Sequence, residues 1–280
     1  MELNIDRNII IKNPATKDFL ADVYYPKHQE KLPLVIFAHG YKGYKDWGAW
    51  DLMAKEFAQA GFFFVKFNFS HNGTTVDQPS DFADLEAFGN NNFSIEMSDY
   101  DEVLNYFYNH PKIDQEKITI IGHSRGGGIT VIKAAEDERV KAVVILAGVS
   151  HFGYRFPSDE RLVEWEKEGV MYSENGRTHQ QMPHYFQFFQ DYKANEQRFN
   201  IQHAAHHLEK PTLILQGTAD EAVKEKEANL LNDWIKDSEL FLIQEANHTF
   251  GSKEPWRESK LPNDLGIATA KMISFLKTYF

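Results

Sequence analysis

The stretch "IIGHSRGGGIT", residues 120–130, decides how the rest of the chain is interpreted. It places Ser124 after a run of apolar β-formers, where a helix is expected to begin, and continues with Gly126, Gly127 and Gly128. Glycine is the weakest helix former apart from proline, so these residues lower the helix propensity at the start of the helix. A tight strand-to-helix turn explains this choice, because residues without a Cβ atom let strand and helix approach closely.

The turn fits the pattern G-x-S-x-G from Gly122 to Gly126. In such a turn the serine adopts a strained conformation and its hydroxyl stands at the tip, while the following helix directs free N–H groups towards it. The pattern is short enough to arise by chance, and glycines also serve tight turns that carry no chemistry. The strand before it and the helix after it favour Ser124 as a nucleophile.

The rest of the chain alternates apolar runs with helical patterns. Continuous apolar runs predict strands buried on both faces at 33–39, 62–69, 118–122, 142–148, 212–217 and 240–244. Helical patterns occupy 46–61, 94–110, 127–138, 225–237 and 264–280. Two alternating runs, 3–12 and 18–25, predict an antiparallel hairpin. We therefore expect an α/β fold with a mostly parallel eight-stranded sheet, an antiparallel N-terminal hairpin and helices on both faces.

Residues 150–210 break this alternation. They contain no good strand but have helix-like stretches at 159–169 and 182–199. The segment is too long for an ordinary connection, so we expect a small helical cap inserted within one domain that spans residues 1–280. The polar, turn-rich stretch 70–92 predicts a long loop of the kind that is often functional.

Composition narrows the class of protein. A hydrophobic fraction of 42% with 25% charged residues is typical of a globular chain, and every apolar run is shorter than the ~18 residues of a membrane helix. The first residues lack a signal-peptide pattern, so we expect a cytoplasmic protein without a membrane partner. A net charge of -11 argues against nucleic acid, and the absence of cysteine excludes a thiol nucleophile and disulfides.

A serine nucleophile needs a base, and the base needs an acid that fixes its tautomer. Asp220 in "LILQGTADEAV" and His248 in "LFLIQEANHTFG" each follow a predicted buried strand. Loops at the carboxyl ends of parallel strands converge on one crevice, so we expect both side chains near Ser124. Glu221 and Glu245 are alternative acids, and Asp220 is favoured by its place directly after the strand.

Four motifs together resemble the α/β-hydrolase superfamily over essentially the whole chain: "FAHGYKG", "GHSRGG", "QGTADEAV" and "ANHTF". Within it the chain is most similar to dienelactone-hydrolase-like serine esterases, with prolyl-oligopeptidase-like peptidases and cinnamoyl or feruloyl esterases as neighbours. The resemblance implies Ser124 as nucleophile, His248 as base and Asp220 as its orienting acid. It also implies an oxyanion hole made by the backbone N–H groups of Tyr41 and Arg125.

These assignments predict a serine hydrolase that cleaves a small-molecule carboxylic ester through an acyl-enzyme, with no cofactor and no metal. One alternative is a prolyl-oligopeptidase-like peptidase or amidase. Another is a non-catalytic relative that binds a ligand, although such proteins usually lose one of the three residues. Acyl and alcohol specificity and oligomeric state are not set by the sequence.

Other residues receive simpler interpretations. We expect His39 and His123 to support the turns that carry Tyr41 and Ser124. Helical spacing of His203, His206 and His207 would suit a metal, but without a carboxylate in a matching motif a cap or surface helix is favoured. The Arg125 side chain is expected to form a structural salt bridge. Most aromatic residues of the cap should pack in its core, and a few should line a pocket above Ser124.

Overall fold

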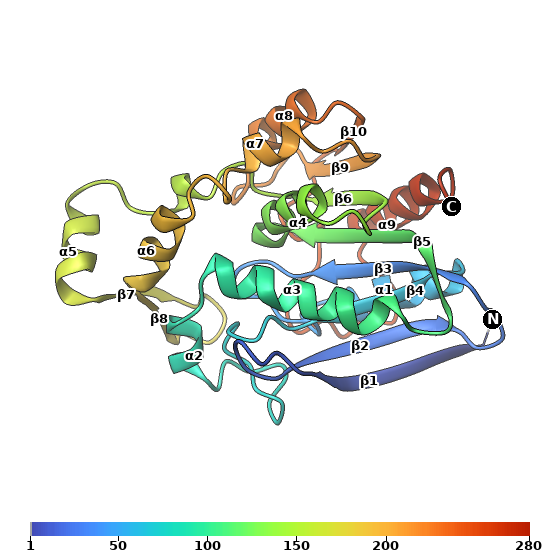
Figure 1. The fold of residues 1–280 in the computed structure, drawn as a ribbon, viewed down its shortest axis with the longest axis horizontal. Coiled ribbons are helices and arrows are strands. Elements are labelled where there is room, and N and C mark those ends of the chain that lie inside the picture. The colour runs from blue at the N-terminus through green and yellow to red at the C-terminus, as the bar shows by residue number, and fades with distance from the viewer. Residues whose placement is uncertain (1) are drawn as a thin grey trace.

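The computed structural model describes residues 2–280 and contains an eight-stranded sheet with the strand order β1-β2-β4-β3-β5-β6-β9-β10 (Figure 1). The strands are β1 (Leu3–Ile11), β2 (Phe19–Pro26), β3 (Leu32–Ala38), β4 (Phe63–Phe67), β5 (Ile113–His123), β6 (Ala142–Leu146), β9 (Thr212–Gly217) and β10 (Ser238–Ile243). Strand β2 is antiparallel to both of its neighbours, and the pairs from β4 to β10 are parallel. The predicted fold class and antiparallel N-terminal hairpin are confirmed.

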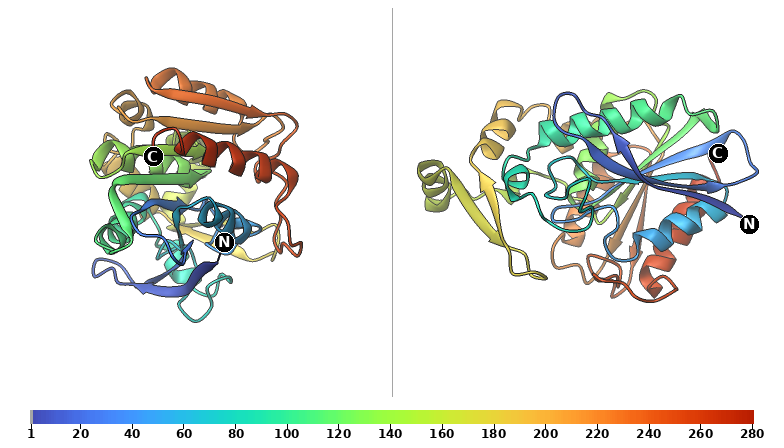
Figure 2. Two further views of the ribbon diagram at one scale, coloured as in Figure 1. Left: turned by 90° about the vertical axis from the view of Figure 1, so that its right-hand side faces the viewer. Right: turned by 90° about the horizontal axis from the view of Figure 1, so that it is seen from below.

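Helices cover both faces of the sheet (Figures 1 and 2). Helices α1 (Trp50–Gln59) and α9 (Asn263–Leu276) lie on one face, and α3 (Phe93–Tyr108), α4 (Arg125–Glu136) and α8 (Glu225–Trp234) lie on the other. Side chains of β3 alternate between the two cores: Leu34 and Ile36 pack with α3 and α4, whereas Val35 and Phe37 pack with α1 and α9. Burial on both faces explains the continuous apolar runs of the central strands.

No helix among residues 2–280 combines the length and apolarity needed to cross a bilayer.

The edge strand β1 carries a bulge. Its register against β2 shifts between Asp6 and Ile9, and Asn8 adopts a left-handed φ of 55°. Asparagine tolerates this conformation better than most residues. The bulge turns the Asn8 N–H inward, where it donates to Asp22 Oδ1 at 2.8 Å.

The chain between β6 and β9 forms η1 (Gly153–Arg155), α5 (Glu160–Glu168), β7 (Val170–Glu174), β8 (Gln181–Tyr185), α6 (Gln187–Ala194) and α7 (Ile201–His206). Helices α5 and α6 and the two strands project beyond the carboxyl ends of the central strands, at the left of Figure 1. Strands β7 and β8 pair antiparallel in a separate two-stranded sheet, here named the cap hairpin and taken to include loop 175–180.

The cap hairpin corrects the expectation of a purely helical insertion without strands. Both strands are short, β7 has no fully buried residue, and β8 contains Pro183, a residue rarely found inside strands. The helix-like stretch 182–199 is helical only over 187–194, because its first residues belong to β8. The dipeptide Asn175-Gly176 in the loop between β7 and β8 is typical of β-hairpin turns and could have indicated this hairpin.

The predicted loop 70–92 is irregular except for the short helix α2 (Leu85–Gly89). It packs against the cap hairpin: a Cβ atom at Gly89 would lie 2.8 Å from the ring of Tyr185. The side chain of Gln180 also donates to the Phe82 carbonyl at 3.1 Å. This loop therefore forms part of the base on which the cap hairpin rests.

Candidate active site

Ser124 lies between β5 and α4 with φ 57° and ψ -120°. Such a positive φ is strained for a residue with a side chain, as predicted for this turn. The Ser124 N–H donates to Leu146 O at 3.0 Å, and its carbonyl accepts from Gly127 N at 2.9 Å. These backbone bonds hold the residue in its strained conformation. Ser124 also lines two cavities.

Glycines around Ser124 occupy positions that exclude any side chain. A Cβ atom at Gly122 would lie 2.1 Å from Gly126 O, and one at Gly126 would lie 2.5 Å from His39 O. A Cβ atom at Gly40 would lie 2.8 Å from the Cβ of Ser124. The loss of helix propensity noted in the sequence is therefore explained by close packing of the turn.

The structure brings the other two predicted residues to Ser124. His248 Nε2 lies 2.9 Å from Ser124 Oγ, and His248 Nδ1 lies 2.8 Å from Asp220 Oδ2. An ionised aspartate only accepts hydrogen bonds, so Nδ1 carries the proton and Nε2 is free to accept from the serine hydroxyl. The Asp220 side chain has no exposed surface, whereas 23% of the His248 side chain is exposed.

Asp220 is held by several donors besides His248. Its Oδ1 accepts from the N–H groups of Ala222 and Val223 at 2.8 and 2.9 Å, and its Oδ2 accepts from the Gln216 amide at 3.0 Å. Burial opposes ionisation, but the hydrogen bond and charge of His248 outweigh it, and the pKa of Asp220 lies below its usual value. The carboxylate is therefore charged and fixed in orientation at neutral pH.

The alternative acids lie apart from this chain of hydrogen bonds. Both Glu221 and Glu245 are exposed, and neither forms a side-chain hydrogen bond to His248. Glu245 sits at the turn after β10 with φ 58°, and its N–H donates to Thr218 Oγ1. Glu221 precedes α8, which begins only at Glu225.

Residues 39–44 form a turn after β3. This turn carries Tyr41, whose N–H is a predicted oxyanion donor, and on that prediction it is named here the oxyanion loop. The Gly40 carbonyl accepts from His39 Nδ1 at 2.9 Å and from Gly43 N at 3.0 Å. In a trans peptide the C=O and the next N–H point in opposite directions, so these bonds direct the Tyr41 N–H away from His39. Burial lowers the pKa of His39 to about 4, which keeps the ring neutral, with Nε2 accepting from the Phe69 N–H.

His123 supports the loop that carries His248 in a similar way. Its Nε2 donates to the His248 carbonyl at 2.9 Å. Burial, with the neighbouring His248, lowers the pKa of His123 to about 3, so the ring stays neutral. Both supporting histidines therefore act through the backbone of the residues next to them.

Arg125 forms the expected salt bridge. Its Nη1 lies 3.2 Å from Oε1 of Glu96, a carboxylate with only 3% of its surface exposed. The guanidinium also lies 4.4 Å from the centre of the Tyr41 ring. The side chains of the two residues whose N–H groups were predicted to form an oxyanion hole are thus in contact with each other.

Two cavities meet at Ser124 and His248. The larger, about 540 Å³, lies under the cap, and the smaller, about 130 Å³, lies on the side of Trp47 and Thr249. The larger one is lined mainly by the apolar side chains Phe93, Val149, Phe152, Phe156, Met171 and Phe188. A few cap aromatics therefore line a pocket beside Ser124, as expected, while Trp165 is buried in the cap.

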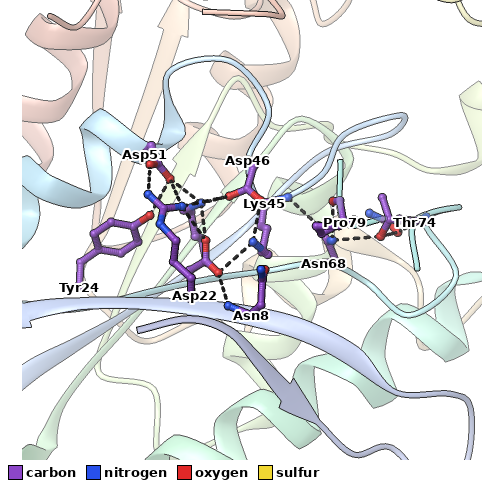
Figure 3. Close-up of polar contacts among 12 residues, drawn as sticks. Asn8, Asp22, Tyr24, Lys45, Asp46, Asp51, Asn68, Thr74 and Pro79 are labelled. Atoms are coloured by element: carbon purple, nitrogen blue, oxygen red, sulfur yellow. Dashed lines mark hydrogen bonds and ion pairs between the residues drawn. The ribbon is translucent and has the colours of Figure 1, made fainter. Parts of the chain in front are cut away.

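Among residues 2–280, one group of carboxylates lies close enough to share a metal ion: Asp22, Asp46 and Asp51 (Figure 3). The Lys66 ammonium already lies among them, 2.9 Å from Asp22 Oδ2 and 2.8 Å from Asp51 Oδ1. The Lys66 ammonium in this position supplies the positive charge that a metal ion would bring. His203 and its neighbours on α7 do not belong to this group.

The profile of the alpha/beta hydrolase fold family matches residues 33–175, which include β3, the oxyanion loop and Ser124. The match covers more than half of the chain. This protein belongs to the α/β-hydrolase fold family. Its eight-stranded, mostly parallel sheet with an antiparallel N-terminal pair is the sheet of this fold.

Two solved structures share this α/β-hydrolase fold over nearly the whole chain. Est1E from Butyrivibrio proteoclasticus with bound ferulic acid has a TM-score of 0.75 and 18% identity, covering 96% of this chain and 98% of that one. The esterase domain of a Rhodothermus marinus protein has a TM-score of 0.67 and 15% identity, covering 99% of each chain. At these identities the likeness concerns the fold.

Two curated relatives are similar over part of their length. The quorum-quenching protein AidA of Acinetobacter baumannii is 27% identical over 124 residues, 44% of this chain and 38% of AidA. An uncharacterised protein of Pseudomonas aeruginosa is 27% identical over 140 residues, 49% of this chain and 35% of that protein. The matched regions thus cover little more than a third of these relatives.

Three polar residues near the site of this α/β hydrolase were missed in the sequence. Glu96 holds Arg125, and Ser173 and His184 of the cap hairpin both contact the Tyr41 hydroxyl. Sequence separations of 132 and 143 residues leave no local pattern that links the last two to Tyr41. The dipeptide Asn175-Gly176 indicates a hairpin at most and gives no register that would place Ser173 or His184 beside Tyr41.

Proposed function

We propose that this α/β hydrolase cleaves carboxylic esters through an acyl-enzyme on Ser124. The observation that carries the proposal is the hydrogen-bonded chain Asp220–His248–Ser124 at the junction of two cavities. A serine hydroxyl with a neutral, oriented imidazole within hydrogen-bond reach is the arrangement that nucleophilic acyl transfer requires.

In the proposed reaction Ser124 Oγ attacks the ester carbonyl carbon while its proton passes to His248 Nε2. The negative charge on the carbonyl oxygen is stabilised by the N–H groups of Tyr41 and Arg125, the latter at the positive end of α4. The intermediate collapses, the C–O bond to the alcohol breaks, and His248 returns the proton to the leaving oxygen. Water then repeats these steps on the acyl-enzyme and releases the acid.

The shape of the site supports a small-molecule ester with one bulky apolar part. The 540 Å³ cavity with aromatic walls suits that part, and the 130 Å³ cavity suits a smaller one. The neighbours are consistent with this substrate class: ferulic acid is bound in Est1E, and the Rhodothermus structure is described as an esterase domain.

The test is hydrolysis of p-nitrophenyl esters from acetate to long acyl chains, with a p-nitroanilide of one of the same acids and Ser124→Ala as the control. We expect Ser124-dependent turnover of the esters and much slower cleavage of the anilide. Amide cleavage that matches ester cleavage would favour the peptidase or amidase instead.

A fluorophosphonate probe separates the enzyme from a non-catalytic binding protein. A nucleophilic Ser124 should be labelled covalently, and the label should disappear in Ser124→Ala. Absence of labelling together with absence of ester turnover would reject the proposed function and favour a ligand-binding role.

A further inference from the structure

The cap hairpin holds two consecutive residues of the oxyanion loop. The Tyr41 hydroxyl lies 2.6 Å from Ser173 Oγ on β7 and 2.6 Å from His184 Nε2 on β8. The next residue, Lys42, donates from Nζ to the Glu174 carbonyl at 2.6 Å. The cap is therefore joined by polar contacts to the segment that carries one of the proposed oxyanion donors.

Both hydrogen bonds of the Tyr41 hydroxyl can form with a neutral His184. Burial, with the nearby charges of Arg125 and Lys42, lowers the pKa of His184 to about 3, so the ring is neutral. The Tyr41 hydroxyl either donates to Nε2 and accepts from Ser173, or accepts from Nε2–H and donates to Ser173, and both arrangements anchor it. The backbone of β8 is fixed in turn, because Trp165 Nε1 donates to the His184 carbonyl at 2.7 Å.

The peptide that carries the Tyr41 N–H is held on its N-terminal side, where the Gly40 carbonyl accepts from His39 Nδ1 and from Gly43 N. On the other side of Tyr41, Lys42 adopts a left-handed φ of 55° that costs free energy. The anchor on the Tyr41 side chain therefore adds a restraint next to a strained backbone position. The ring also packs under the Arg125 guanidinium at 4.4 Å, which ties the two proposed oxyanion donors together.

We propose that Ser173 and His184 are positioning residues of the oxyanion hole, and that the cap hairpin directs the Tyr41 N–H by holding its hydroxyl. This inference rests on the proposed function, because it assigns to the cap a share in the rate of acyl transfer in addition to substrate choice. Loss of the anchor should weaken binding of the transition state more than binding of the ester.

The experiment compares Tyr41→Phe and Ser173→Ala with the matched control Tyr185→Phe. Tyr185 also joins the cap hairpin to the body of the protein, with its hydroxyl 2.5 Å from Glu86 Oε2. Within residues 2–280 it forms no side-chain hydrogen bond with the oxyanion loop. Each variant is assayed for kcat and KM on one p-nitrophenyl ester. The inhibition constant of a trifluoromethyl ketone with the same acyl chain is also measured, because its adduct carries an oxyanion.

We expect Tyr41→Phe to lower kcat about tenfold with little change in KM, since small displacements of reacting groups cost large factors in rate. The ketone should bind weaker by a similar factor. Ser173→Ala should show a smaller loss of the same kind, and Ser173→Thr should restore activity because it keeps the hydroxyl. Combining Tyr41→Phe with Ser173→Ala should add little, because both remove one anchor.

Unchanged kcat and ketone affinity in Tyr41→Phe, or an equal loss in Tyr185→Phe, would overturn the inference. Thermal melting of each variant checks folding, and Ser173→Ala supplies the test if Tyr41→Phe does not fold. Full turnover in Ser124→Ala would instead reject the proposed function, so the two failures are distinguishable.

Discussion

Asp22 and Asp220 are both fully buried carboxylates, yet they face different partners. Asp22 lies 2.8 Å from the Lys45 ammonium and 2.9 Å from the Lys66 ammonium (Figure 3). Asp220 instead accepts from backbone N–H groups, an amide and His248. The first aspartate has permanently charged partners, and the second has one partner that can gain and lose a proton.

The difference separates a structural use of a buried charge from the chemical use that we propose for Asp220. The group around Asp22 contains Asp46 and Asp51 as further acids and Lys45, Lys66 and Arg7 as cations, so positive and negative charges balance. A group of balanced, permanent charges of this kind does not serve proton transfer at neutral pH. At Asp220 the partially exposed imidazole links a fixed negative charge to Ser124, which lets a proton move without moving the aspartate.

The largest expected effect is on Asp220. Asp220→Asn should lower kcat about 10⁴-fold, because an amide no longer enforces the tautomer in which His248 Nε2 accepts from Ser124. The protein should remain folded, as judged by circular dichroism and thermal melting. Ester hydrolysis under saturating substrate measures the loss.

Glu245→Gln is the matched control for this change, since it removes one carboxylate from the loop that carries His248. We expect its kcat to equal that of the unchanged protein, because Glu245 is exposed. A large loss of kcat in Glu245→Gln with activity retained in Asp220→Asn would show that the acid is misassigned.

The corresponding change at Asp22 should act on stability. Asp22→Asn leaves two buried ammonium groups with one acceptor fewer and should cost about 3 kcal/mol or more in the free energy of unfolding. The kcat of the folded protein should stay near its original value. Urea denaturation followed by fluorescence gives the first quantity, and an unchanged midpoint would mean that Asp46 and Asp51 suffice for both lysines.

Lowering the pH should show the contribution of ionised Asp22 to the free energy of unfolding without a mutation. Burial by itself opposes ionisation of Asp22, but Lys66 and Lys45 outweigh it and lower its pKa to about 2. Since the unfolded pKa is about 3.9, the group stabilises the fold by about 3 kcal/mol above that pH, and this contribution is lost as pH falls towards 2. Urea midpoints between pH 5 and 2 measure the slope. Asp22→Asn should show a shallower slope, and identical slopes would contradict the assignment.

The smallest effect is expected at the rim of the group. Tyr24 donates its hydroxyl proton to Asp51 Oδ1 at 2.6 Å, and Asp51 keeps Arg7 and Lys66 as partners when that bond is removed. Tyr24→Phe should therefore cost about 1 kcal/mol of unfolding free energy. A loss as large as that of Asp22→Asn would mean that the hydroxyl holds the group together, contrary to the view that the lysines do.

The sequence was sufficient to predict those residues of the candidate site that lie directly after buried strands. Ser124, Asp220 and His248 each occupy a loop after a continuous apolar run, and parallel strands bring such loops together whatever the side chains between them. The geometry of the backbone made these three positions predictable. Tyr41 was added only by the resemblance to α/β hydrolases, which the motif "FAHGYKG" helps to carry.

The sequence was insufficient where contacts depend on side chains far apart in the chain. Strand β8 was hidden by Pro183, so the contacts of Ser173 and His184 with Tyr41 could not be anticipated. The partners of Asp22 come from β4 and from the loop before α1, and no periodicity in β2 indicates them. Such pairings are set by tertiary packing, for which a single sequence carries no local signal.

The bulge in β1 also affects how this molecule meets other copies of itself. An edge strand offers unpaired backbone groups on which a foreign strand can grow, and β1 exposes Ile5 and Ile10 along that edge. The left-handed Asn8 interrupts the ladder between them. Asn8 donates a hydrogen bond to the buried carboxylate of Asp22. The same residue interrupts the continuous strand edge that intermolecular β-pairing and aggregation need.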